Sequence, residues 1–322
     1  MHPQQSSTVC SQQLIAAHSV SRSSNLNAIA ENGHVMRFGK SFLHTFKNDG
    51  LLTPEPIGVN QASTFTGFCH LHDAATFAPI DQPITSLADE HIFLVAYRAI
   101  CRELFTKSAV SAEAVLKTTR QLDKGKDKVA QEVIQRFNDY REVGLKAGLR
   151  DLTEAKSAYD DALLHKSYEK LSYYVVTLEH ALPIVWTVGF TPEIDFHGNR
   201  LQSLDNVEMF VDHLTCSVLM TATGSAIVFA WLAEKNGAST ALINSLDRIK
   251  THQLSSAIVR LIFEHGENVF FSPSWWNDLD DRTKTTIARH ANSTTDKSDH
   301  CLMLDGSLQV LWSIVDRKKV VR

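Results

Sequence analysis

The switch in hydrophobic periodicity along the chain constrains the fold more than any other feature of the sequence. Apolar residues first recur every three or four positions, the period of one buried helical face, at Ile92, Phe93, Ala96, Ile100 and Leu104. From residue 172 the apolar residues gather instead into β-branched and aromatic runs, which are typical of strands. Helices and strands thus occupy separate blocks, and the sequence predicts an α+β fold.

The strand block contains four apolar runs that predict an antiparallel sheet. A link as short as Gly224-Ser225 joins two of them, and only antiparallel neighbours can be connected so tightly. The four runs are Tyr173–Leu178, Ile184–Phe190, Leu214–Ala222 and Ala226–Leu232. A C-terminal α+β domain, residues 172–322, is completed by helices at about 239–264 and 278–291 and by an apolar stretch at Leu308–Val315. The sequence does not indicate the role of this domain.

The helical block, residues 86–171, predicts a helical hairpin or arm. Gly125 is the expected hinge, because glycine adopts backbone conformations that turn a chain sharply. A long helix follows to the end of this block, with a break expected near Gly144 or Gly148. Periodic apolar positions in such helices usually mark packing faces, so we expect a structural role for the arm.

Residues 1–85 differ from both blocks, because they are rich in turn formers and histidine and lack a long amphipathic period. Seven of the fifteen histidines fall before residue 92. A small segment this poor in aliphatic periodicity commonly needs a metal ion or a larger partner domain to hold it. We therefore expect residues 1–85 to form a metal-stapled module.

Composition limits the environment of the protein and its partners. The content of 43% apolar and 21% charged residues is that of a globular protein, and no apolar run approaches the ~20 residues that cross a bilayer. Five scattered cysteines and the lack of a secretion signal predict the cytoplasm. The net charge of −4 argues against coating of nucleic acid through phosphate neutralisation alone. Nucleic acid at a local site and a protein partner both stay open, as does the oligomeric state.

The strongest motif is Cys-x-x-His within TGFCHLHD, which ends the N-terminal block. This spacing presents two zinc ligands on one tight turn, so we expect Cys69 Sγ and a ring nitrogen of His72 within about 4 Å of each other. A tetrahedral shell needs further ligands, for which Cys10 and His18 are the first candidates. The alternatives for the open positions are His34, His44 and His70. A metal-free Cys69–His dyad for thiol catalysis is a competing interpretation, which a metal assay separates.

Two weaker patterns favour structural interpretations. In PEIDFHGN, the alternate residues Glu193, Asp195 and His197 could share one face of an extended segment and bind a cation. Such polar residues after a strand more often form a turn. Trp275-Trp276 follows Ser-Pro-Ser, which predicts a helix start held by a buried tryptophan. The serine-hydrolase, P-loop and dinucleotide motifs GxSxG, GxxxxGK[ST] and GxGxxG are absent from the sequence.

The stretches CSQQLIAAHSVSRS (10–23) and ASTFTGFCHLHD (62–73), continued by FAPID (77–81), resemble a group of bacterial proteins. Those proteins are similar in outline to the HNH, or ββα-metal, nucleases, and the likeness spans residues 10–107. HNH enzymes have a cysteine pair before a histidine-bearing strand and a later cysteine pair before a helix. The resemblance implies that His18 is the general base, that Cys69 and His72 are the later ligand pair, and that Asp73 is the last metal-binding position.

The chain departs from the HNH pattern in ways that define two functional hypotheses. Cys10 has no Cys-x-x-Cys partner, and Ala17 stands where the family usually has a metal-binding residue. The first hypothesis is metal-dependent phosphodiester hydrolysis on nucleic acid, with His18 as base and Asp73 on a second divalent metal such as Mg²⁺. The alternative is a non-catalytic binding or scaffold protein in bacterial defence. Its structural zinc ligands would be Cys10, His18, Cys69 and His72.

Overall fold

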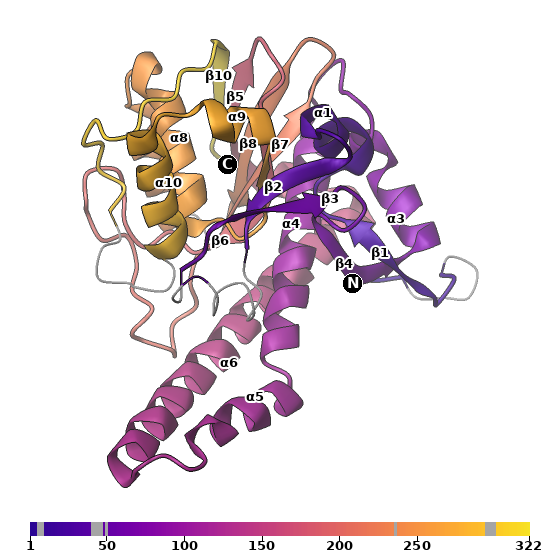
Figure 1. Ribbon diagram of the computed structural model, residues 1–322. Helices are drawn as coiled ribbons and strands as arrows, with labels where there is room; N and C mark the ends of the chain where they lie inside the picture. Colours follow the sequence, from indigo (N-terminus) through magenta and orange to yellow (C-terminus); the bar gives the residue numbers. More distant parts are fainter. Residues whose placement is uncertain (5–9, 40–47, 49–50, 235–236, 294–300) are drawn as a thin grey trace.

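An eight-stranded antiparallel sheet lies at the centre of the molecule, seen in Figure 1 with helices packed around it. The computed structural model describes residues 1–322 except 5–9, 40–47, 49–50, 235–236 and 294–300. The strand order is β10-β5-β8-β7-β6-β9-β2-β3, and every neighbouring pair is antiparallel. The strands are β2 His34–Phe38, β3 Pro54–Gly58, β5 Leu171–Leu178, β6 Ile184–Phe190, β7 Leu214–Met220, β8 Ser225–Leu232, β9 Val269–Phe271 and β10 Ile314–Val320. Together with the helices they confirm the predicted α+β fold class.

Both faces of this sheet are buried, because successive side chains of its central strands enter two different cores. On β8, Ile227, Phe229 and Trp231 enter one core, whereas Ala226 and Ala230 enter the other. The first core is covered by α7 Gly237–Asp247, α8 Thr251–His265 and α10 Asp281–Ser293, with the short α9 Pro273–Asp278 at its margin. The second core is covered by α4 Asp89–Val110 and α6 Lys128–His165. The alanines of β8 face the second core, where α4 contacts the sheet.

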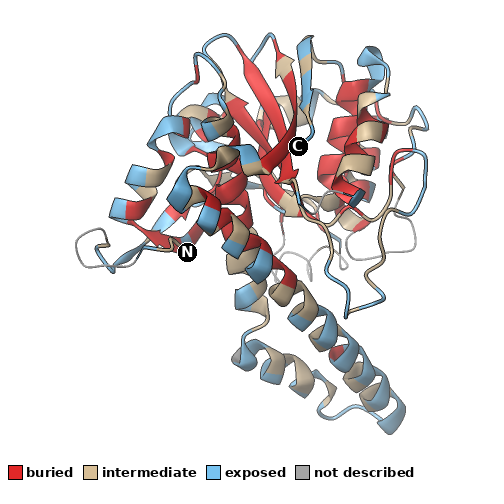
Figure 2. Ribbon diagram, turned by 180° about the vertical axis from the view of Figure 1, so that it is seen from behind, coloured by how far each residue is buried: buried red, intermediate tan, exposed pale blue. Residues whose placement is uncertain are grey.

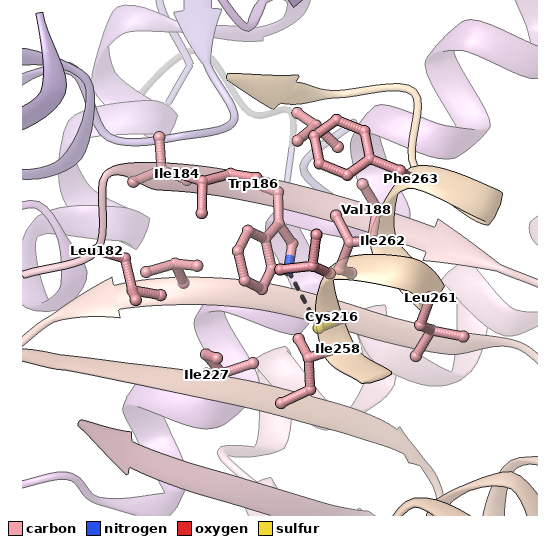
Figure 3. Close-up of a cluster of buried hydrophobic side chains, with 14 of the residues drawn as sticks. Leu182, Ile184, Trp186, Val188, Cys216, Ile227, Ile258, Leu261, Ile262 and Phe263 are labelled. Carbon is pink, nitrogen blue, oxygen red and sulfur yellow. Dashed lines mark hydrogen bonds between the residues drawn. The ribbon is translucent and has the colours of Figure 1, made fainter. Parts of the chain in front are cut away.

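The first core is centred on a tryptophan from β6, shown in Figure 3 between the strands and α8. Trp186 is fully buried, and its Nε1 donates a hydrogen bond to Cys216 Sγ of β7 at 3.1 Å. Ile258 and Ile262 of α8 lie over these strands. The polar atom of the largest buried side chain is therefore satisfied inside an apolar cluster.

The N-terminal half of helix α4 is buried on nearly all sides, unlike the one-faced helix that its periodicity predicts, whereas the C-terminal half leads out to the largely exposed arm (Figure 2). The ten consecutive residues from Ile92 to Cys101 are all buried. One side of the helix packs on β6, β7 and β8, and another side contacts β4. A helix between two layers needs apolar residues around its whole circumference, which explains the extra buried positions.

The predicted arm is present as α5 Glu113–Arg120 and the first half of α6, which project away from the body in Figure 1. The turn between them includes Gly125 with φ +79°, so the expected hinge is confirmed. The expected break near Gly144 or Gly148 is wrong, because α6 continues through both. It also ends earlier than predicted, at His165, where Lys166 takes a left-handed conformation.

The predicted helix over residues 239–264 is also wrong, because the structure has two helices there. α7 ends at Asp247 and α8 begins at Thr251. The predicted apolar stretch near the C-terminus divides as well: Leu308 and Val310 join the first core, and strand β10 begins only at Ile314.

The N-terminal region contributes to two sheets. β1 Leu14–His18 pairs antiparallel with β4 Thr64–Cys69, and α3 His70–Phe77 follows directly. Between them, β2 and β3 extend the large sheet through β9, and the short α1 Asn27–Ile29 precedes β2. The boundary predicted at residue 85 therefore does not separate two independent layers. We use the term ββα module for β1, β4 and α3.

The two edges of the large sheet are both unusual in composition. The edge strand β3 contains Pro54 and Pro56, which carry no N–H group. The opposite edge strand, β10, has the sequence IVDRKKV, with four consecutive charged residues. These residues lie at the outer strands of an otherwise apolar sheet.

Candidate metal centre

The junction of β4 and α3 places the two residues of the Cys-x-x-His motif on one turn. β4 ends in extended conformation at Cys69, and the first turn of α3 brings His72 back beside it. Cys69 Sγ lies 3.5 Å from His72 Nδ1. The predicted approach of these two atoms to within about 4 Å is confirmed.

Cys10 joins this pair from the segment that precedes β1. Its Sγ lies 3.8 Å from Cys69 Sγ, and the backbone N–H of Gln12 donates to Cys10 Sγ at 3.3 Å. A disulfide requires a sulfur–sulfur distance of about 2.05 Å, so both residues are free thiols. The ligand atoms of Cys10, Cys69 and His72 all lie within 4.8 Å of one another, and the described residues contain no other such group.

The distances in this group match those of a tetrahedral zinc site. Zn–S bonds of about 2.3 Å and a tetrahedral angle separate two sulfur ligands by about 3.8 Å. A sulfur and a histidine nitrogen at about 2.0–2.1 Å from the metal are separated by about 3.5 Å. The observed 3.8 Å and 3.5 Å are these two separations. Cys10, Cys69 and His72 therefore form a group that could hold a metal ion, with two of its three separations at the tetrahedral values.

The protonation of the group also suits a metal. Burial alone would raise the pKa of the Cys69 thiol, but the backbone N–H of His72, together with Ser11 and Cys10, outweighs burial and lowers it to about 6. Burial and the nearby N-terminal amine lower the pKa of His72. Thiolate sulfur and neutral imidazole are the forms that bind metals, so the folded chain holds these ligands ready.

The access to Cys69 weighs against the competing thiol-dyad interpretation. Its side chain approaches His72 as a dyad requires, but Cys69 is only 2% exposed. The ring of His2 also stacks on His72, with centroids 4.0 Å apart. A nucleophilic thiol must reach a substrate, whereas a structural metal ligand gains from enclosure.

His18, predicted both as a zinc ligand and as the base, does not reach this group. Leu14 pairs with Cys69 in the β1–β4 ladder, whereas His18 pairs with Thr64, four residues further along β1 or about 13 Å. His18 Nε2 instead contacts the carbonyl oxygen of Val59 at 3.2 Å. The prediction of His18 as a ligand of this group is therefore wrong. The register of the β1–β4 pair, which the sequence does not reveal, places His18 at the far end of β1 from the group.

The alternative ligands do not complete the group either. His34 lies on β2, where its Nδ1 contacts the Asn32 carbonyl at 2.9 Å, and His70 is exposed on α3. His44 lies outside the described residues. Among those residues, three ligands are assembled and a fourth is not.

A second group of polar residues includes both predicted catalytic residues. His18 and Asp73 interact electrostatically with the same two groups, Arg98 of α4 and Asp81. Arg98 Nη1 donates to Asp81 Oδ1 at 2.9 Å, and its guanidinium lies 4.0 Å above the Phe77 ring. Burial raises the pKa of Asp73 and lowers that of His18. We call His18, Asp73, Asp81 and Arg98 the charged cluster.

Arg98 was missed by the sequence reasoning, although a signal was present. It is the one charged residue between Ile92 and Cys101 in an otherwise buried helix, and it is itself only 3% exposed. A lone charge in such a run indicates a specific partner, because burying an unpaired charge is costly. That partner, Asp81, ends the FAPID stretch of the resemblance, but no role had been expected for it.

Both weaker sequence patterns are structural, as predicted, but the expected buried tryptophan is wrong, because Trp275 and Trp276 are only half-buried against the first core. Asp195 Oδ1 accepts hydrogen bonds from the backbone N–H groups of His197 and Asn199, each at 2.8 Å, which is a turn closed by its own carboxylate. Ser272 Oγ accepts from the N–H of Trp275 at 3.1 Å and caps α9. The adjacent Trp276 packs on Phe271 with ring centroids 5.3 Å apart.

Comparison of the chain with protein-family models, with curated proteins and with solved structures finds no match. Among the described residues, no helix has both the length and the apolar character needed to span a membrane. Fold and site together define an α+β protein in which two cysteines and a histidine could hold a metal ion.

Proposed function

We propose that this chain is a zinc protein, in which Zn²⁺ bound by Cys10, Cys69 and His72 holds the ββα module together. The observation that carries this proposal is the match of both interatomic distances, 3.8 Å and 3.5 Å, to the edges of a tetrahedral site. Zinc is favoured over harder cations because two of the three ligands are sulfur.

The position of the metal supports a structural rather than a catalytic role. It would link the segment before β1 to the β4–α3 junction, so that two separate parts of residues 1–85 share one ion. A metal that binds only the folded form stabilises that form. The chain then serves as a zinc-stapled binding or scaffold protein. A reducing compartment such as the cytoplasm would keep both cysteines available as ligands.

Elemental analysis of the purified protein tests this proposal. We expect about one zinc per chain in the wild type and almost none after Cys10→Ser, Cys69→Ser or His72→Ala, since each removes a ligand. His70→Ala is the matched control, because His70 lies on the same turn of α3 and is exposed. Full zinc content in the His72→Ala protein, or a loss of zinc in the control, would contradict the site.

A second candidate function is phosphodiester hydrolysis of nucleic acid, and the hydrogen bond of His18 favours it. A carbonyl oxygen only accepts, so His18 Nε2 carries the proton and Nδ1 keeps its lone pair. Burial lowers the pKa of His18, which keeps the ring neutral. A neutral histidine with a free nitrogen is the form that accepts a proton from water. Two antiparallel strands followed by a helix also agree with the implied ββα arrangement.

Nuclease assays with Mg²⁺ or Mn²⁺ separate the two candidates. If His18 is a base, His18→Ala keeps its zinc, while hydrolysis of single- or double-stranded DNA or RNA falls by about 10²–10⁴-fold. His34→Ala, an exposed histidine on β2, is the matched control. Asp73 is the proposed contact for the second metal, so Asp73→Asn should lower the rate at limiting Mg²⁺. If the wild-type protein binds zinc but cleaves none of these substrates, the nuclease candidate is rejected and only the structural role of zinc is retained.

A further inference from the structure

The arm carries an apolar face that nothing covers among the described residues. On α6, Val129, Val133, Phe137 and Tyr140 are 71%, 62%, 64% and 73% exposed. Their spacing of four, four and three residues places them on one side of the helix, and we call them the arm stripe. A row of four large exposed apolar side chains on one helix marks an interaction surface rather than a solvated one.

The arm stripe is not the face that holds the arm together. The other side of α6 packs on α5, where Asn138 Nδ2 donates to the Thr119 carbonyl at 3.3 Å. Gln135 Nε2 likewise donates to the carbonyl of Arg120 at 2.9 Å. The hairpin is therefore already closed through its polar contacts, and the stripe points outward.

The arm stripe leads into a cavity at the base of the arm. This cavity, of about 450 Å³, lies between α6, the end of α4 and the segment 204–213. Tyr140, the last residue of the stripe, lines it together with Val143 and Gly144. Met209, which is 62% exposed, lies on the opposite wall. The apolar surface thus continues from the outer half of the arm to the body.

The charges beside the stripe have the order that a second, antiparallel copy would complement. Asp127 and Glu132 lie toward the start of α6, whereas Arg136 and Arg141 lie further along. If two copies of α6 run antiparallel about a two-fold axis near residue 134, Glu132 faces Arg136 of the second copy and Asp127 faces its Arg141. Glu132 and Arg136 have no ion-pair partner within the part of the chain that the structure describes.

From this order of charges we propose that the arm stripe is a dimerisation surface whose occupant is the arm of a second copy of this chain. Val133 of each copy packs beside Phe137 of the other, and residues 128–140, which are helical in both copies, give about 20 Å of paired helix. The tip of each arm then lies against the cavity of the other copy. Leu122, which is 63% exposed at that tip, is the side chain placed to enter it. This inference is independent of the zinc site.

Sedimentation equilibrium of the full-length protein gives the first test. We expect a reversible dimer at micromolar concentration and, after Phe137→Asp, a dissociation constant raised by at least about tenfold, since a charge replaces a central aromatic contact. Leu311→Asp is the control, because Leu311 is an even more exposed apolar residue, at 79%, and lies beside α8 rather than on the arm. Equal thermal unfolding of the variants excludes misfolding. A monomeric wild type, or a dimer unaffected by Phe137→Asp, would overturn the proposal.

A charge exchange between two chains tests the antiparallel order itself. Glu132→Arg and Arg136→Glu should each weaken self-association, because each gives two like-charged residues across the two-fold axis. Mixing the two variants should restore a dimer that contains one chain of each, since every facing pair is then opposite in sign. Failure of the mixture to form this heterodimer, with both variants folded, would refute the antiparallel pairing.

Discussion

The large sheet and the ββα module are held together by different means. The central strands of the sheet send alternate side chains into two extensive cores, so their stability comes from apolar burial on both faces. The module has one thin layer, in which Phe65, Phe68 and Phe77 pack against α4. Its outer side holds Cys10, Cys69 and His72 instead of a second core. Where burial is one-sided, the proposed zinc would supply the missing cross-link.

The largest expected effect comes from breaking the sheet core. Trp186→Ala removes a fully buried indole and should lower the free energy of unfolding by about 3–5 kcal/mol, through lost burial and the cavity that remains. Because the proposed zinc ligands Cys10, Cys69 and His72 lie outside this core, zinc content should not change. Chemical denaturation and elemental analysis measure the two quantities. Loss of zinc in a folded Trp186→Ala protein would show that the two regions depend on each other.

Removing the metal should affect the module alone. In Cys69→Ser we expect amide hydrogen exchange to accelerate in β1, β4 and α3, while β5 to β8 keep their protection. Cys301→Ser is the control, because this half-buried cysteine lies outside the zinc group. Uniform loss of protection across both regions would mean that the module is part of one cooperative unit with the sheet.

A smaller effect is expected from the turn that follows β6. The Asp195 carboxylate accepts three hydrogen bonds, including one from Asn199 Nδ2 at 2.9 Å. Asp195→Ala should cost about 1–3 kcal/mol by leaving these donors unpaired. Adding His197→Ala should leave the zinc content unchanged, because neither residue belongs to the metal group. A double variant with less zinc than the wild type would mean that this turn, rather than the module, holds the metal.

The smallest predicted effect is a pH dependence that arises in the module. Burial lowers the pKa of His18 below its ordinary value of 6.5, so the unfolded chain binds this proton more readily. The His18 contribution to stability is therefore complete above about pH 6.5 and is lost as the pH falls below it. Melting temperatures between pH 7.5 and 5.5 should decline less steeply in His18→Gln than in the wild type. An equally steep fall of melting temperature in both proteins would mean that a titrating group other than His18 causes the pH dependence.

The sequence predicted the parts of this molecule that depend on local pattern. The four predicted strands of the large sheet begin and end within a few residues of their predicted limits. A short run of β-branched and aromatic residues such as Ala226–Leu232 strongly favours a strand over a helix. Gly144 and Gly148 were misjudged, since glycine permits a helix break without requiring one. An added Cβ at Gly148 would meet only the flexible end of Lys107, 3.2 Å from Nζ, and one at Gly144 would meet nothing within 4 Å, so packing requires glycine at neither position.

The site was predictable only as far as its ligands lie on one turn. Cys69 and His72 are three residues apart, so the helix geometry alone fixes their approach. Cys10 and His18 depend on how β1 pairs with β4, and register is set by contacts distant in sequence. The irregularity between Ile15 and Ala17 in this ladder shifts the register once more. Cys10 therefore joins the group that could hold a metal ion, whereas His18 does not.

The composition of the two sheet edges has a consequence for how copies of this chain meet. An open sheet offers unpaired backbone groups at its outer strands, which can recruit strands from other molecules and lead to aggregates. The prolines of β3 remove donors at one edge, and the charges of β10 would repel an identical strand at the other. Uncontrolled growth of the sheet from molecule to molecule is thus discouraged at both ends. Ordered association of copies would instead use a surface that pairs with its own copy and leaves no free edge, such as the proposed arm stripe of α6.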